Sequence, residues 1–81
     1  MIARVTFEEI ARLVGAQLGR KQVQHDDRFF EDLGAESSDI ANLVAAVEDK
    51  YRIQIEEWEI ANVRTPADLF DLVQKHLSPA Q

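Results

Sequence analysis

The segment from Phe29 to Tyr51 constrains the fold of this 81-residue chain more than any other stretch. Within it, apolar residues recur every three or four positions from Ile40 to Val47, and Tyr51 follows one turn later. This spacing is typical of a helix with one apolar stripe. It predicts an amphipathic helix from Ser37 to Tyr51, about 22 Å long at 1.5 Å per residue.

The start of this predicted helix is rich in short polar side chains. Residues 36–39 read Glu-Ser-Ser-Asp, and such side chains can satisfy the free backbone N–H groups at a helix start. Ser37 follows Gly34-Ala35 and is expected to be accessible. A phosphate attached to it would lie at a helix N-terminus, where N–H groups and the helix dipole favour an anion. The alternative is that Ser37 and Ser38 only cap the helix.

A first helix is predicted from Phe7 to Leu18. Its apolar residues follow helical spacing, and Gly19 is a natural stop. Thr6 and Glu9 have the spacing of a capping box, in which each side chain accepts from the other's backbone N–H.

The last helix is predicted to start after Thr65, because a threonine cap followed by Pro66 suits a first helical turn. Its apolar stripe ends at Leu77, before Ser78-Pro79. Residues 56–61 are predicted to form one or two helical turns. The alternation over residues 52–55 is too short to form a sheet without partner strands.

The connection from Gly19 to Ala35 has no regular period. A loop this long in a compact domain is typically a binding loop or disordered. Phe29 and Phe30 argue against full disorder, and at least one of them is expected to attach the loop to the core. The prediction is an all-α fold for residues 1–81 as a single domain: a small four-helix bundle with three main helices, one short helix, and a long loop between the first two helices.

The net charge of −6 is concentrated in the middle of the chain. Between Glu31 and Glu59 there are nine acidic and two basic residues, a balance of −7. This placement argues against nucleic acid and for basic protein surfaces as partners. Glu48 and Asp49 lie in the predicted last helical turn, where negative charge is disfavoured by about 0.3–1 kcal/mol each. They are interpreted as part of a surface that a basic partner binds, with a merely solvated face as the alternative.

The sequence offers little for catalysis or for a metal ion. His25 and His76 are far apart, there is no cysteine, and no calcium-loop spacing is present. A serine nucleophile needs a neighbouring base, and none is nearby in sequence. His76 is expected to be packed or half-exposed. No segment has the apolar length of a signal peptide or membrane span, so a monomer in the cytoplasm, with no membrane insertion, is expected.

Taken together, these residues resemble the acyl carrier protein family. The family's signature is leucine-glycine, a small residue, then aspartate-serine-leucine-aspartate at the start of an acidic second helix. Residues 33–39 read Leu-Gly-Ala-Glu-Ser-Ser-Asp and match it without gaps. The resemblance covers essentially the whole chain, strongly from Phe30 to Tyr51 and weakly in the first helix.

The resemblance implies a non-enzymatic carrier in which Ser37 receives a 4′-phosphopantetheine arm from coenzyme A through a phosphopantetheinyl transferase. The arm would hold acyl groups as thioesters for lipid- or polyketide-type biosynthetic enzymes. These partners would present basic patches to an acidic surface comprising Glu36, Asp39, Asn42, Glu48, Asp49, Glu56 and Glu57. The acyl chain would tuck between the helices, near Leu43, Val47, Tyr51, Ile55, Ile60 and Val63.

Several positions depart from the family pattern. Glu36 replaces the usual aspartate, and Ser38 replaces the leucine that the transferase typically contacts. Asn42 and Ala45 alter the surface that faces partners, and Trp58 is unusual in this acidic segment. These departures suggest a specialised carrier rather than the general fatty-acid one. A peptidyl or D-alanyl carrier, or an unmodified helical interaction module, remains the alternative.

Overall fold

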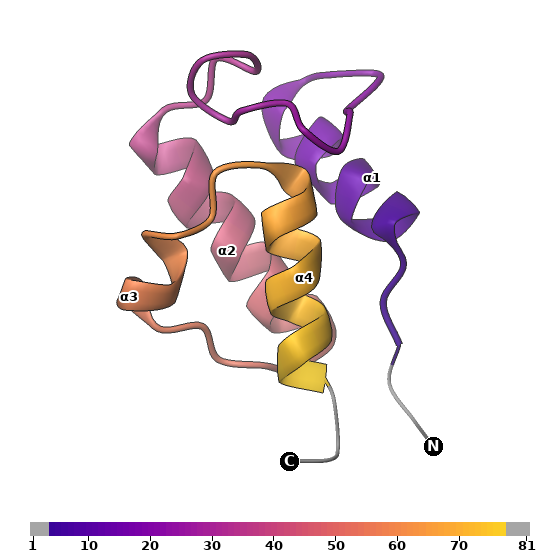
Figure 1. Cartoon of the computed structure of the whole chain (residues 1–81), viewed down its shortest axis with the longest axis vertical. Coiled ribbons are helices and arrows are strands. Elements are labelled where there is room, and N and C mark those ends of the chain that lie inside the picture. The colour runs from indigo at the N-terminus through magenta and orange to yellow at the C-terminus, as the bar shows by residue number, and fades with distance from the viewer. Residues whose placement is uncertain (1–3, 78–81) are drawn as a thin grey trace.

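The structure is a computed structural model, and it describes residues 4–77 of the chain. Four helices joined by loops make up this part (Figure 1). They are α1 (Phe7–Leu18), α2 (Ser37–Tyr51), α3 (Glu57–Ile60) and α4 (Pro66–Leu77). No strand occurs within residues 4–77, so the predicted all-α fold with three main helices and one short helix is confirmed. Helices α1, α2 and α4 pack together, α3 lies to one side, and the long loop crosses one end of the bundle.

The core is formed where the apolar stripes of the three long helices meet. Each helix contributes fully buried side chains, such as Ile10 from α1, Leu43 from α2 and Val73 from α4. Fully burying one such side chain stabilises the fold by about 1.5–3 kcal/mol relative to leaving it exposed. The packing of these stripes explains why helices of this length are stable, because isolated helices of 12–15 residues are marginal in water.

The start of α1 differs from the predicted capping box. The Thr6 hydroxyl accepts a hydrogen bond from the Glu9 N–H at 3.2 Å, as expected. The Glu9 carboxylate, however, accepts from the Tyr51 hydroxyl at 2.8 Å. Only the Thr6 half of the box is therefore present, and Glu9 instead ties α1 to the last turn of α2.

The start of α4 follows the prediction closely. The Thr65 hydroxyl accepts from the Asp68 N–H at 3.1 Å, and the Asp68 carboxylate accepts from the Arg64 N–H at 3.1 Å. Pro66 is buried at the first helical position, where its missing N–H costs nothing. These bonds hold the backbone where α3 leads into α4.

The long loop is attached to the core by Phe29, as predicted for one of the two phenylalanines. Phe29 is 1% exposed, whereas Phe30 is 55% exposed. The Phe29 N–H also donates to the Arg64 carbonyl at 2.9 Å, and the His25 carbonyl accepts from the Ala67 N–H at 3.1 Å. The His25 ring stacks on Phe7 with 3.7 Å between ring centroids. The loop is therefore an ordered part of the bundle.

A turn inside the loop is closed by Asp32. Its carboxylate accepts from the Arg28 N–H at 2.9 Å and from the Arg28 side chain at 3.3 Å. These hydrogen bonds, the backbone bond above all, hold the pKa of the Asp32 carboxyl below its usual range. The pair is exposed, so its contribution is to the shape of the loop more than to overall stability.

Candidate functional site

The three residues before Glu36 position the start of α2. Leu33 and Ala35 are buried, and the Ala35 N–H donates to the Phe29 carbonyl at 2.8 Å. Between them Gly34 has a φ of 68°, in the left-handed region that residues with a Cβ adopt only at a cost. The chain therefore turns sharply at Gly34, and the buried side chains of Leu33 and Ala35 attach it to the core on both sides of the turn.

Ser37 is the first residue of α2, and it is exposed. The N-cap position belongs to Glu36, whose N–H donates to the Asp39 carboxylate at 2.9 Å. Within residues 4–77, no side-chain hydrogen bond involves the hydroxyl of Ser37 or Ser38. Neither serine is therefore a helix cap, and the Ser37 hydroxyl is accessible for modification by another protein.

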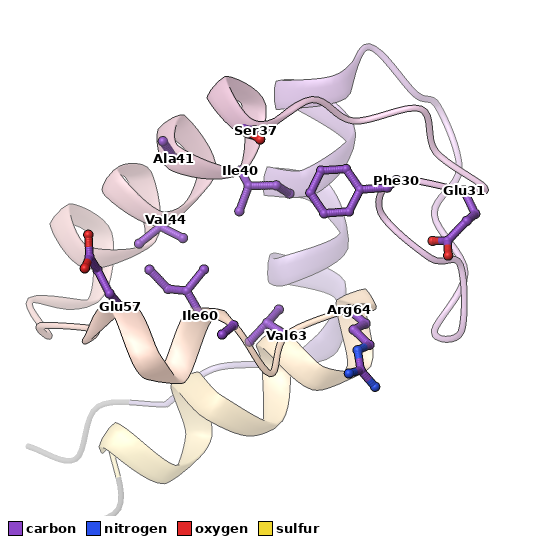
Figure 2. A pocket seen from close by; sticks show the side chains of 11 residues that line it. Phe30, Glu31, Ser37, Ile40, Ala41, Val44, Glu57, Ile60, Val63 and Arg64 are labelled. Carbon is purple, nitrogen blue, oxygen red and sulfur yellow. The ribbon is translucent and has the colours of Figure 1, made fainter.

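An open groove of about 590 Å³ begins beside Ser37 and runs between α2 and α3. Figure 2 shows Ile40 and Val44 of α2 pointing toward Ile60 of α3 and Val63 of the following loop. These four apolar side chains line the groove between the two helices. Because Ser37 also lines the groove, a group attached to its hydroxyl could lie along this apolar surface.

The rim of the groove carries charge and one exposed aromatic ring. Phe30, Glu31 and Arg64 lie at one end in Figure 2, and Glu57 lies at the other. The floor is therefore apolar while the edges are polar and face water.

A small cavity shares Ile40, Val44, Ile60 and Val63 with the groove. This cavity has a volume of about 10 Å³, roughly the volume that admits one water, and its lining also includes Leu43 and Ile55. Four of the six residues expected to form an acyl-chain pocket thus surround this small cavity, and Ile60 and Val63 also reach the groove. The other two lie elsewhere: Val47 is fully buried in the core, and Tyr51 bonds to Glu9.

The residues expected to dock partners divide into two groups. Five are exposed, either on α2 or α3 or at the residue just before one of these helices: Glu36, Asn42, Asp49, Glu56 and Glu57. The other two, Asp39 and Glu48, are half-buried and already accept backbone hydrogen bonds. Glu48 accepts from the Ile55 N–H at 2.8 Å, so an acid in the last turn of α2 holds the following loop. This hydrogen bond explains why an acidic residue is tolerated in the last turn of α2, and the sequence did not suggest it.

Sequence reasoning did not assign Phe30, Ile40, Val44 or Arg64 to the site. Ile40 and Val44 belong to the apolar stripe of α2, and their helical spacing from Leu43 could have indicated them. Phe30 and Arg64 carry no such signal, because the groove forms only when the loop packs against the residues after α3.

The site fits a carrier better than a catalyst. Within the described residues no cluster of three potential ligands could hold a metal ion. Within residues 4–77, no side-chain base hydrogen-bonds to the Ser37 hydroxyl, the arrangement that activates a serine nucleophile. An exposed hydroxyl beside an apolar groove suits the attachment of a long, flexible 4′-phosphopantetheine arm. No helix within residues 4–77 is long and apolar enough to cross a bilayer.

Comparison with known sequences leads to the same chemistry. The family model described as "Phosphopantetheine attachment site" matches residues 8–73. An acyl carrier protein of Helicobacter hepaticus is 35% identical over 71 residues, which cover 85% of this chain and 93% of that protein. An acyl carrier protein of Wolinella succinogenes is 34% identical over 70 residues, covering 84% and 92% of the two chains.

Solved structures of similar proteins share the fold. The acyl carrier protein of Thermotoga maritima superposes with a TM-score of 0.73 at 32% identity, covering 86% of this chain and 84% of that one. The actinorhodin holo acyl carrier protein of Streptomyces coelicolor gives a TM-score of 0.77 at 26% identity, with complete coverage of both chains.

Proposed function

Because this chain belongs to the acyl carrier protein family, which carries its cargo on 4′-phosphopantetheine, we propose that Ser37 is the residue that bears the arm. The observation that carries this assignment is the position of Ser37, exposed at the start of α2 and lining the groove between α2 and α3. Ser38 is also exposed but does not line the groove, so an arm on Ser38 would start outside it.

In the attachment step the carrier supplies the Ser37 hydroxyl as the nucleophile. Its oxygen attacks the phosphorus of coenzyme A that bears the pantetheine, a new P–O bond forms, and the bond to the departing adenosine bisphosphate breaks. The hydroxyl proton passes to a base of the transferase. Once attached, the arm supplies a terminal thiol that holds acyl groups as thioesters. The new phosphodiester is stabilised by the helix N-terminus, because free N–H groups and the helix dipole favour an anion there.

The partners of a carrier are a phosphopantetheinyl transferase and the enzymes that load, modify or accept the acyl group. We place their docking surface on the exposed acids Glu36, Asp49, Glu56 and Glu57, with Asn42 among them. Basic patches on the partners would complement this surface, and the attraction would weaken as salt screens it. Asp39 and Glu48 support the surface mainly through the backbone bonds they accept.

The cargo belongs to lipid- or polyketide-type biosynthesis in this proposal. Two observations support the polyketide side. One similar structure, an acyl carrier protein from the actinorhodin polyketide synthase, was solved as a 3-oxo-butyl intermediate mimic. The cavity beside Leu43 and Ile55 is small, so a long alkyl chain there would require α2 and α3 to move apart.

We propose a specialised carrier that acts as a cytoplasmic monomer and a single domain. Loading assays with acyl-, aminoacyl- and D-alanyl-donating enzymes separate it from a peptidyl or D-alanyl carrier.

The test is the intact mass of the protein after incubation with coenzyme A and a broad-specificity phosphopantetheinyl transferase, followed by peptide mapping. We expect one added phosphopantetheine on Ser37, none in Ser37→Ala, and normal modification in Ser38→Ala. The Ser38 variant is a matched control, since both hydroxyls are exposed in the first turn of the same helix.

Two outcomes would contradict the proposal in different ways. Modification mapped to Ser38 would keep the carrier function and refute the site. No modification by any transferase, including that of the host, would favour an unmodified interaction module, and full biological function of Ser37→Ala would favour it further.

A further inference from the structure

Phe30 is a large apolar side chain that the fold leaves exposed to water. The adjacent Phe29 is buried and attaches the long loop to the core, so the ring of Phe30 is not used for that contact. In Figure 2 the Phe30 ring points from the loop toward Ile40 of α2, and both side chains line the groove beside Ser37. The exposed ring is therefore part of the surface that surrounds the proposed attachment site.

The backbone on both sides of Phe30 is held by hydrogen bonds. The Phe29 carbonyl accepts from the Ala35 N–H at 2.8 Å. The Arg28 carbonyl accepts from the Asp32 N–H at 2.8 Å, across the turn that contains Phe30. A ring presented by a fixed backbone loses little conformational freedom when a ligand packs against it. Phe30 is thus arranged as a contact residue whose ordering cost is already met by the fold.

The side of α2 that faces the groove next to Ser37 is apolar. Ile40 and Ala41 follow Ser37 by three and four positions, so they lie on the same side of the helix. Both also line the groove. Figure 2 shows Ser37, Ile40 and the Phe30 ring toward the same part of the groove, with Glu57 at the far end. A group that leaves the Ser37 hydroxyl into the groove therefore meets Ile40 on α2 and the Phe30 ring on the loop.

The chemistry of 4′-phosphopantetheine matches this order of surfaces. The phosphodiester is followed by one methylene and then by a carbon that bears two methyl groups, and the hydroxyl and the two amides come only after it. The bulkiest apolar group of the arm is therefore close to the serine. Removing its methyl groups from water against Ile40 and the Phe30 ring is favourable.

From this geometry we propose that Phe30 is a positioning residue for the arm. Its ring and Ile40 hold the dimethyl group between them, and this contact directs the rest of the arm along the apolar floor toward Ile60. The inference rests on the proposed attachment of the arm at Ser37. Without the ring, the dimethyl group has an apolar contact on one side only, and the arm leaves the groove for water.

The test compares isotope-labelled apo and holo protein by NMR. The holo form is made with coenzyme A and a phosphopantetheinyl transferase, and the added mass and its position are verified by peptide mapping. For the wild type we expect NOEs from the two arm methyl groups to the Phe30 ring and to Ile40, and a change in the amide signals of Ile60 and Val63 on attachment. Phe30→Ala should lose the NOEs to Ile40, and its holo amide signals should return to their apo positions.

Two further variants separate a positioning role from a general effect on the fold. Phe30→Tyr keeps the ring and adds a hydroxyl that can face water, so it should keep the NOEs and the amide changes. Trp58→Ala is the matched control, since Trp58 is also a large, exposed apolar side chain but lines a different hollow. It should leave the signals of the arm unchanged. The NOEs of the wild type test the contact without any substitution.

The outcomes distinguish this inference from the proposed function. A wild-type holo protein without NOEs from the arm to Phe30 and Ile40, or amide changes that persist in Phe30→Ala, would overturn the role of Phe30 and leave the carrier intact. No added mass, or an addition mapped to Ser38, would overturn the proposed attachment site and this inference together.

Discussion

The Glu59 carboxylate and the His76 imidazole lie 3.0 Å apart and connect α3 to the last turn of α4. Glu59 is only 9% exposed, and its carboxylate also accepts from the Glu56 N–H at 2.9 Å. A four-residue helix has little stability of its own. This pair is therefore a main attachment of α3, and through Ile60 it holds one wall of the groove.

The contacts of Glu59 lead to a prediction of how the free energy of unfolding depends on pH in the acidic range. The backbone bond from Glu56, followed by the contact with His76, lowers the pKa of Glu59 from its ordinary value of 4.5, although burial opposes this. A carboxyl with a lowered folded-state pKa stabilises the fold above its unfolded pKa, and this contribution is lost as pH falls through the folded value. In denaturant titrations from pH 6 to pH 3, Glu59→Gln should lose less free energy of unfolding than the wild type.

Glu57→Gln is the control for that experiment, because Glu57 is exposed on the same short helix. It should follow the wild-type pH profile. Identical pH profiles for Glu59→Gln and the wild type would contradict a lowered pKa of Glu59 in the folded protein.

The contact between Tyr51 and Glu9 predicts a loss of stability without a loss of modification. Tyr51→Phe removes only the hydroxyl that donates to Glu9 at 2.8 Å, and it should cost about 0.5–1.5 kcal/mol in chemical denaturation. Modification of Ser37 by the transferase should be unaffected, since Tyr51 does not line the groove.

The same tyrosine predicts an alkaline effect. Burial, then the hydrogen bond and charge of Glu9, raise the pKa of Tyr51 well above its ordinary value of 10. A raised folded-state pKa stabilises the fold fully below pH 10, and this contribution is lost as pH rises further. The difference in stability between wild type and Tyr51→Phe should thus shrink above pH 10. A constant difference up to pH 11 would contradict the assignment.

For Gly15→Ala, helix propensity and packing predict changes of opposite sign in the free energy of unfolding. A Cβ at this buried helical position would lie 2.5 Å from the Arg20 carbonyl oxygen, where the chain folds back after α1. Helix propensity alone predicts that Gly15→Ala stabilises by about 1 kcal/mol. We expect destabilisation by about 1–3 kcal/mol, because backbone must shift to relieve the overlap. Thermal or urea unfolding decides between the two signs.

Glu48 and Asp49 are adjacent acids with different predicted roles. Glu48→Ala removes the acceptor of the half-buried Ile55 N–H and should cost about 1–2 kcal/mol of stability. Asp49 is exposed, so Asp49→Ala should change stability by less than about 0.5 kcal/mol.

Asp49 is expected to matter for partner binding instead. In surface-binding measurements at low salt, Asp49→Lys should weaken the complex with a partner enzyme, and added salt should reduce the effect. Indifference to both Asp49→Lys and salt would argue against electrostatic docking there.

The helices follow from local sequence because their information is local. The apolar period, Thr65-Pro66 and Gly19 determine where α1, α2 and α4 begin and end, and the predicted bounds match the observed ones. The leucine-glycine-alanine turn is readable for the same reason, since a left-handed φ at Gly34 is a property of one residue. The family motif around Ser37 is also a contiguous string, so the sequence alone indicated a carrier.

What the tertiary structure decided are contacts between residues distant in the chain. Glu9 was expected to complete its own cap, but Tyr51, 42 positions away, takes its carboxylate. The partner of Glu59 is His76, 17 positions on, and the rim of the groove joins Phe30 to Arg64. The local periodicity of the sequence does not indicate such contacts, because they depend on how the loop and α3 pack against α2 and α4. The sequence determined the helices and the motif, whereas packing decided what surrounds Ser37.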